Sequence, residues 1–237
     1  MTQEAPGAAG VTEQDRGRRL RIDVWTDLVC PWCYVGQARL DQAIAAEGVD
    51  VDLVVHAFEL DPSTPVAGDA APSNLDHLVR AKGMPREQVV AMEEQIRGLA
   101  EEAGVPYVTE RPMANTRQLH RVVQAVARSV GPEAAATLFS RLQGGYFAGE
   151  SDPFDAEVLI AAAVAVGGAE AGVRRAIADD AEDADAWVDA DIFRARSLGV
   201  QGVPFMVFDE RVAAPGAMDV DTYRRALRQL ADGEEVA

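Results

Sequence analysis

The sequence contains only two cysteines among 237 residues, Cys30 and Cys33, which lie three positions apart. One such pair excludes the disulfide scaffold that stabilises small secreted domains. A bridge closing so short a loop would also add little to the stability of a chain this long. The spacing is instead typical of a redox-active dithiol or of half a metal site.

Basic residues are also scarce. Lysine and arginine total 22 against 39 aspartates and glutamates, which gives a formal net charge of −17. This charge argues against a nucleic-acid partner, because phosphates require a cationic surface. It also disfavours binding to an anionic membrane surface. Hydrophobic residues make up 48% of the chain, so a packed core is expected.

Long hydrophobic runs are missing as well. No stretch approaches the roughly 18 consecutive apolar residues that span a bilayer. Arg16, Arg18 and Arg19 are not followed by the apolar segment of a secretory or twin-arginine signal. We therefore expect residues 1–19 to form a flexible tail, and the protein to be cytoplasmic with no membrane partner.

The pattern after this tail predicts a β-α-β unit. Residues 21–27 alternate polar and apolar side chains and are rich in β-formers, as is typical of a strand. Residues 31–46 show helical periodicity and end before Gly48. A second alternating segment, 49–57, predicts another strand. The two cysteines therefore fall at the first strand-to-helix junction.

Helical patterns alone fill residues 63–185, and strand patterns return after Gly199. Segments 203–208 and 211–214 predict a strand pair joined by a tight turn, and Asp219 is the expected N-cap of a final helix.

This element order predicts an α/β protein: a thioredoxin-like fold with a large all-helical insertion. We assign residues 20–62 and 186–232 to the thioredoxin-like domain, and residues 63–185 to the inserted helical domain.

The residues Cys30, Pro31, Trp32 and Cys33 occupy the expected first turn of the helix. There the two sulfurs come close, and the exposed N–H groups and the helix dipole stabilise a thiolate at Cys30. We expect Cys30 to be the attacking nucleophile, and the more buried Cys33 to resolve the mixed disulfide. Pro31 positions the helix, since it needs no N–H partner there, and Trp32 offers substrate an apolar surface.

A zinc site and an inert cysteine pair are the alternatives to redox chemistry. Structural zinc usually needs four ligands, and the sequence has no second cysteine pair. His56, His77 and His120 are scattered and match no zinc spacing. Redox chemistry is therefore the favoured interpretation, and no metal is expected.

The dipeptide Val203-Pro204 precedes the last strand pair. A proline at the start of a central strand is poorly placed unless its peptide bond is unusual, so a cis bond is expected here. Val203 and Pro204 are then expected to bind an extended substrate through backbone groups. The alternative is an ordinary trans proline at a sheet edge.

Several segments combine into a more specific pattern. The cysteine segment reads Thr26-Asp27-Leu28-Val29-Cys30-Pro31-Trp32-Cys33-Tyr34-Val35-Gly36. Further segments are Phe58-Glu59-Leu60-Asp61-Pro62, Ala114-Asn115-Thr116 with His120, Leu198-Gly199-Val200-Gln201-Gly202-Val203-Pro204-Phe205 and Ala214-Pro215-Gly216-Ala217. Together they resemble the DsbA-like FrnE family of cytoplasmic oxidoreductases, over about residues 20–230.

The resemblance implies a thioredoxin domain with a helical insertion, disulfide exchange at Cys30 and Cys33, and a cis bond before Pro204. It implies an enzyme, a protein disulfide oxidoreductase or isomerase, acting on thiol or disulfide substrates that are polypeptides or small molecules. Periplasmic relatives commonly carry a histidine between the cysteines, so Trp32 implies a weaker oxidant. The resemblance fixes neither the substrate nor the oligomeric state.

A sister group shares this architecture: the glutathione-dependent 2-hydroxychromene-2-carboxylate isomerases and the kappa-class transferases. There a serine typically replaces the first cysteine, so the intact pair of this chain disfavours such a function and leaves it as the alternative. No cofactor is expected, although glutathione stays open as a redox partner.

Three polar residues outside the cysteine motif are weaker candidates. Glu59 is either a proton relay to Cys33 or a solvated loop residue. Asn115 and His120 either face the redox centre, or serve as a helix cap and a satisfied core residue.

Overall fold

The computed structural model describes residues 19–67 and 71–231, so the predicted tail lies outside the described residues except for Arg19. In the described chain, four strands form one sheet in the order β2-β1-β3-β4. β1 (Leu20–Thr26) pairs in parallel with β2 (Val51–Ala57) and antiparallel with β3 (Phe205–Phe208). β3 pairs antiparallel with β4 (Val212–Pro215). The predicted β-α-β unit and C-terminal hairpin are both confirmed.

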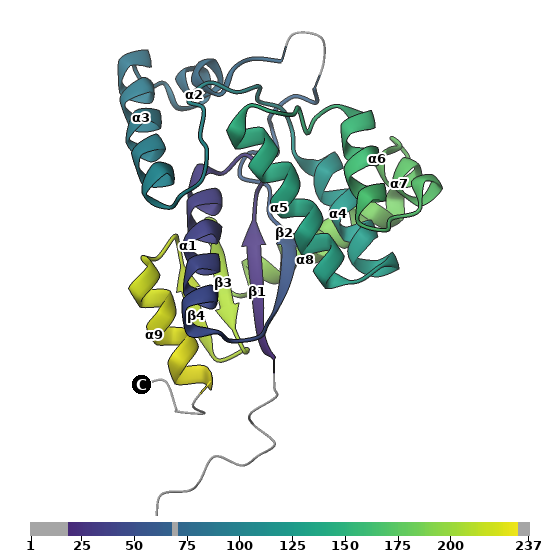
Figure 1. The fold of residues 1–237 in the computed structure, drawn as a ribbon. Helices are drawn as coiled ribbons and strands as arrows, with labels where there is room; N and C mark the ends of the chain where they lie inside the picture. Colours follow the sequence, from purple (N-terminus) through teal and green to yellow (C-terminus); the bar gives the residue numbers. More distant parts are fainter. Residues whose placement is uncertain (1–18, 68–70, 232–237) are drawn as a thin grey trace, which may run out of the picture.

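The central strand β1 is covered on both faces. α1 (Pro31–Glu47) and α9 (Val220–Ala231) lie along one face, and α8 (Glu182–Ser197) lies on the other (Figure 1). Ile22 and Val24 belong to the main hydrophobic core, whereas Trp25 packs against Ala195 of α8. Every residue of β1 except Arg21 is buried.

Local signals in the sequence set the ends of these elements. Pro31 occupies the first turn of α1, and Gly48 ends the helix in the left-handed conformation with φ 64°. Asp209 and Glu210 have φ values of 54° and 57°, and the Arg211 N–H donates to the Phe208 carbonyl at 2.9 Å, which forms the tight turn between the strands of the hairpin. The Asp219 carboxylate accepts the Thr222 N–H at 2.7 Å at the start of α9, as expected of an N-cap.

The segment predicted to be all helical contains no strand in its described part. α4 and α5 pack against β2, and α3 packs against α1 (Figure 1). The predicted domain boundary at residues 185/186 falls within α8, and the division into two domains stays a prediction. The helices before α8 are α2 (Asn74–Lys82), α3 (Arg86–Glu102), α4 (Arg117–Ser129), α5 (Pro132–Ala148), α6 (Ala156–Ala165) and α7 (Glu170–Ile177).

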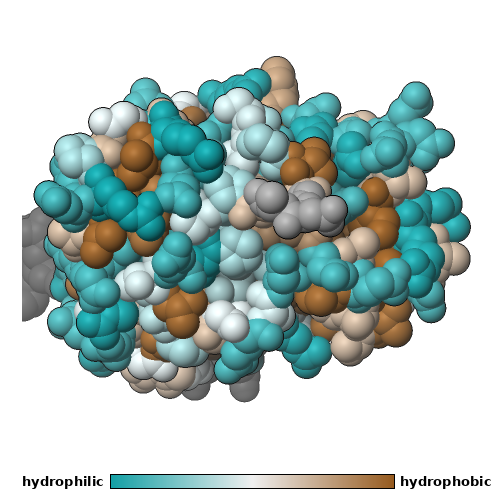
Figure 2. Space-filling model, turned by 90° about the horizontal axis from the view of Figure 1, so that it is seen from above, coloured by the Kyte–Doolittle hydropathy of each residue, from teal (hydrophilic) through white to brown (hydrophobic). Residues whose placement is uncertain are grey.

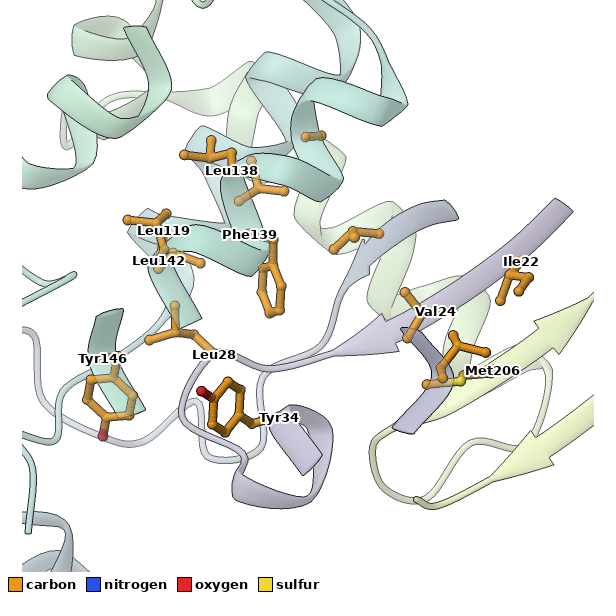
Figure 3. Close-up of a cluster of buried hydrophobic side chains, with 14 of the residues drawn as sticks. Ile22, Val24, Leu28, Tyr34, Leu119, Leu138, Phe139, Leu142, Tyr146 and Met206 are labelled. Atoms are coloured by element: carbon orange, nitrogen blue, oxygen red, sulfur yellow. The ribbon is translucent and has the colours of Figure 1, made fainter. Parts of the chain in front are cut away.

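One continuous hydrophobic core joins the sheet to these helices. Figure 3 shows five members of this core: Val24 and Met206 on the sheet, Leu28 in the turn before α1, Tyr34 in α1 and Phe139 in α5. Burying a large apolar side chain contributes about 1.5–3 kcal/mol. The helical layer is therefore fixed to the sheet by the same residues that stabilise the sheet.

A buried ion pair stabilises the contact between this layer and α1. The ring of Tyr34, the residue after Cys33, stacks on the ring of Phe147, which stacks on the ring of Tyr107. The distances between the ring centroids are 4.6 Å and 5.2 Å. The Arg111 guanidinium lies 4.7 Å from the centre of the Phe147 ring. It pairs with Glu93 at 3.1 Å, and both side chains are only 2% exposed.

Replacing Glu93 with alanine should lower the free energy of unfolding by about 3–5 kcal/mol, because Arg111 would stay buried without its counter-ion. Urea unfolding followed by circular dichroism measures this. Glu94→Ala is the matched control on the same helix, since Glu94 pairs with Arg97 at the surface. Its cost should be at most about 1 kcal/mol. Equal effects of the two changes would contradict the assigned role of the buried pair.

Candidate active site

The cysteine pair lies where β1 ends and α1 begins, at the upper end of the sheet in Figure 1. A short turn connects the two elements, in which the Cys30 N–H donates to the Asp27 carbonyl at 3.2 Å. Cys30 is the N-cap residue of α1, and Pro31 follows at the first helical position. The predicted strand–cysteine–helix junction is therefore present.

The sulfur of Cys30 has two polar partners. It accepts a hydrogen bond from the Cys33 N–H at 3.3 Å, and its thiol donates to the Val203 carbonyl at 3.6 Å. A sulfur in the N-cap position faces the free N–H groups and the positive end of the helix dipole. The structure thus brings together Cys30, Cys33 and Val203, which lie up to 173 residues apart in sequence.

The Val203–Pro204 peptide bond is cis, as expected. Pro204 lies against α1 at Gly36, one turn beyond Cys33. A Cβ atom at Gly36 would lie 3.3 Å from Pro204 Cγ and 3.2 Å from the Cβ of Ala217. Glycine at this position therefore permits the close approach of α1 to the proline segment.

The two thiols differ in their surroundings rather than in their exposure. Cys30 is 3% exposed and Cys33 is 2% exposed, so both thiols are buried to nearly the same extent. Burial raises the pKa of Cys33 well above its usual value, and Cys30 raises it further, against hydrogen bonds from the Thr26 hydroxyl and the Asp27 N–H.

Trp32 is 42% exposed, so its indole forms part of the surface beside the thiols. Seen from this end of the molecule, hydrophobic residues form separate patches divided by hydrophilic ones (Figure 2). A pocket of about 490 Å³ lies between α8 and the loop after β2. Its lining includes Phe58, Phe193, Arg196 and Val200, and Phe193 is 73% exposed.

The buried carboxylate beside the cysteines is Asp27 rather than Glu59. Asp27 is 1% exposed, and its carboxylate accepts the Leu60 N–H at 2.8 Å and contacts His120 Nε2 at 3.2 Å. Since a carboxylate only accepts, Nε2 of His120 carries the proton. The other ring nitrogen, Nδ1, has no hydrogen-bond partner within the described residues. Sequence reasoning selected His120 but did not find its partner, although Asp27 stands in the motif segment itself.

The two remaining candidates have structural partners. Glu59 pairs with Arg117 at 3.0 Å, and its side chain is only 6% exposed, so it is not a solvated loop residue. Asn115 precedes α4, where its side-chain oxygen accepts the Arg117 N–H at 2.9 Å and its amide donates to the Pro62 carbonyl at 3.2 Å. Among the described residues, no three His, Cys, Asp or Glu side chains are grouped to hold a metal ion.

Fold and site together define a thioredoxin-fold protein with a helical insertion and a Cys-x-x-Cys pair at its first helix. The family model described as the DSBA-like thioredoxin domain matches residues 21–228. The chain belongs to this family of disulfide-exchange enzymes, which is compatible with the resemblance drawn from its motifs.

Solved structures agree with this assignment. A probable DsbA oxidoreductase from Streptomyces coelicolor is 36% identical, with a TM-score of 0.78 and 92% of each chain covered. The cytosolic disulfide reductase DsbM from Pseudomonas aeruginosa, solved with GSH, is 18% identical, with a TM-score of 0.57 over 89% of this chain and 98% of that one. A 2-hydroxychromene-2-carboxylate isomerase is 18% identical, with a TM-score of 0.60 over 90% and 97%. These last two show a shared fold only. The comparison with curated proteins found no match.

Replacing Asp27 with alanine should lower the free energy of unfolding by about 1–3 kcal/mol, because the Leu60 N–H and the His120 ring would lose their buried acceptor. Asp27→Asn is the matched control, since its amide oxygen can still accept the Leu60 N–H. Urea unfolding of both variants measures the difference. An alanine variant as stable as the wild type would show that these contacts do not stabilise the loops around the cysteines.

Proposed function

We propose that this chain catalyses thiol–disulfide exchange through Cys30 and Cys33. The observation that carries the proposal is the Cys30 sulfur at the N-cap of α1, where it accepts the Cys33 N–H at 3.3 Å. A helix N-terminus favours negative charge, and the thiolate is the reactive form of a cysteine. Membership of the disulfide-exchange family supports the same conclusion.

In the reductive direction, the Cys30 thiolate attacks one sulfur of the substrate disulfide. A mixed disulfide forms, and the other substrate sulfur leaves as a thiolate that takes up a proton. The Cys33 thiol then loses its proton and attacks the Cys30 sulfur, which releases the second substrate thiol and forms the Cys30–Cys33 disulfide. The substrate gains two electrons and the cysteine pair loses two. The reverse sequence oxidises a substrate dithiol.

The same mixed disulfide supports isomerisation when a second thiol of the substrate attacks it before Cys33 does. Substrates of either kind, polypeptides or small molecules, would lie against Trp32 and along Val203 and Pro204. The exposed indole and the Val203 carbonyl close to the Cys30 sulfur support this placement.

Glutathione is the small thiol that we propose as redox partner, with no bound cofactor. The enzyme must be returned to its starting state after each exchange, and glutathione maintains the thiols of the reducing cytoplasm. The solved structure of DsbM contains GSH on the same fold. We place the protein in the cytoplasm, where the pair would rest as a dithiol. Among the described helices, none has the length and hydrophobicity needed to cross a membrane.

Titration of Cys30 and Cys33 against glutathione buffers should show a reversible two-electron transition. Its midpoint should be more reducing than about −120 mV, the potential of a strongly oxidising DsbA, because Trp32 adds no positive charge beside the thiolate. Mass spectrometry after acid quenching and thiol alkylation gives the oxidised fraction. The Cys30→Ser variant must show no such transition. Absence of an internal disulfide across the whole range would overturn the proposed function.

Replacing Cys33 with serine should trap the mixed disulfide, because nothing remains to attack the Cys30 sulfur. After incubation with oxidised glutathione, the variant should carry one glutathione on Cys30, whereas the wild type should carry an internal disulfide. Intact-mass analysis distinguishes the two products. A glutathione-dependent isomerase would instead turn over 2-hydroxychromene-2-carboxylate whether or not Cys33 is present, and that result would favour the alternative function.

A further inference from the structure

A buried group of charged side chains lies on the face of the sheet covered by α8. His56 of β2 contacts Asp23 of β1 through Nε2 at 2.6 Å and Asp191 of α8 through Nδ1 at 2.9 Å. An ionised carboxylate only accepts hydrogen bonds, so both contacts form together when each ring nitrogen carries a proton, which is the imidazolium form of His56. We call these three residues the Asp-His-Asp cluster. The redox chemistry proposed above makes no use of them.

Charge is balanced within the cluster and its neighbour Arg21. Arg21 donates to the Asp23 carboxylate at 2.7 and 2.8 Å. Burial alone would raise the pKa of Asp23, but hydrogen bonds from Arg21 and His56 hold it well below its usual value. Burial alone would lower the pKa of His56, yet its hydrogen bonds to Asp191 and Asp23 outweigh this and raise it.

Asp191 attaches α8 to the sheet at three points. Besides His56, its carboxylate accepts the Ala57 N–H at 2.9 Å, and its main-chain carbonyl accepts the Trp25 indole N–H at 3.1 Å. Beside these contacts lies a small hydrophobic cluster, whose buried residues in the described part of the chain are Trp25, Ala195 and Val200. The polar contacts of Asp191 therefore add to a modest apolar contact at this half of the helix.

This attachment reaches the candidate active site through a short stretch of chain. α8 ends at Ser197, and the Val200 N–H donates back to the Ala195 carbonyl at 3.0 Å. Val200 packs on Trp25, and three residues later the Val203 carbonyl meets the Cys30 thiol at 3.6 Å. The His56 ring also stacks on the Trp25 ring, with 4.5 Å between the ring centroids. The Trp25 ring in turn lies edge-on to the ring of Phe205, the residue after Pro204, with 6.0 Å between the centroids.

We propose that the Asp-His-Asp cluster positions α8 and the Val200–Val203 segment that follows it. In this position the segment can bind an extended polypeptide beside Cys30. The inference rests on the proposed function and specifies its substrate: polypeptide disulfides bind better than small ones while the cluster is intact. A small disulfide needs only the Cys30 sulfur. A polypeptide also needs the Val203 backbone and the pocket whose wall contains Phe193 and Arg196 of α8.

The charge on His56 makes this preference depend on pH. Below its raised pKa the imidazolium holds both carboxylates. Above it the ring keeps one proton, so one of the two carboxylates loses its hydrogen bond from His56, and the link from β1 through His56 to α8 is weakened. The preference for polypeptides should therefore fall as pH rises through the pKa of His56. The charged groups around the ring and its partners are Asp23 and Arg21 of β1, Asp52 of β2, Asp191 and Arg194 of α8, and Glu210 of the hairpin turn.

The test compares a flexible peptide containing one disulfide with 5,5′-dithiobis(2-nitrobenzoate), a small disulfide, between about pH 5 and about pH 9. We divide kcat/KM for the peptide by kcat/KM for the small disulfide. Both reactions depend on the ionisation of Cys30 in the same way, so this dependence cancels in the ratio. In the wild type the ratio should fall with rising pH. In His56→Gln the ratio should be independent of pH and, at acidic pH, about tenfold lower than in the wild type. The loss should come from a higher KM for the peptide. His77→Gln is the matched control, because His77 of α2 pairs with Asp61 of the loop after β2 at 3.3 Å, away from the Asp-His-Asp cluster, and this variant should behave as the wild type.

Amide hydrogen exchange of residues 198–203 tests the geometry without any substrate. Exchange there should be faster in His56→Gln than in the wild type, and Asp191→Asn serves as a second variant should the first fail to fold. A ratio that is independent of pH in the wild type, or that is unchanged in a folded cluster variant, overturns the proposal. Loss of the reaction with the small disulfide in the wild type would instead refute the proposed function itself.

Discussion

Burial of β1 on both faces is the constraint on which the arrangement of the molecule depends. A polar side chain buried in a central strand with helices on each side cannot be satisfied by water. Asp23 in the middle of the strand, Thr26 at its end and Asp27 just beyond it are nevertheless buried. Each must find a partner inside the protein, and their partners come from β1 itself, β2, the loop after β2, the cysteine pair and α4. These polar contacts tie distant parts of the chain to the strand that leads into the cysteines.

Much of the fold could be predicted from local sequence. The boundaries of β1, α1 and the hairpin follow from alternation, from Pro31 and Gly48, and from the turn at Asp209 and Glu210. The cysteine pair and the cis bond before Pro204 lie in segments with recognisable spacing. In each case the residue that determines the structure lies within a few positions of its effect.

The parts that sequence reasoning missed depend on partners far away in the chain. His56 reads as one polar position in an alternating strand, because its partner Asp191 lies 135 residues away. Asp27 and His120 lie 93 residues apart, so nothing near Asp27 shows that its carboxylate is buried. Glu93 and Arg111 belong to different patterns and become a pair only when the loop after α3 folds back. A single sequence carries no signal for such contacts, since they depend on how the helices pack.

The Cys30 sulfur serves α1 as its capping group, and this has a thermodynamic consequence. A cap that forms and breaks covalent bonds during exchange links helix stability to the oxidation state of the protein. Any free energy by which the helix end stabilises an anionic sulfur favours the reduced protein by the same amount. For a two-electron couple, about 1.4 kcal/mol of such stabilisation changes the reduction potential by about 30 mV. Substitutions in the first turn of α1 would therefore act on two quantities at once, and the difference between the unfolding free energies of the two redox states would give the shift of the potential relative to the unfolded chain.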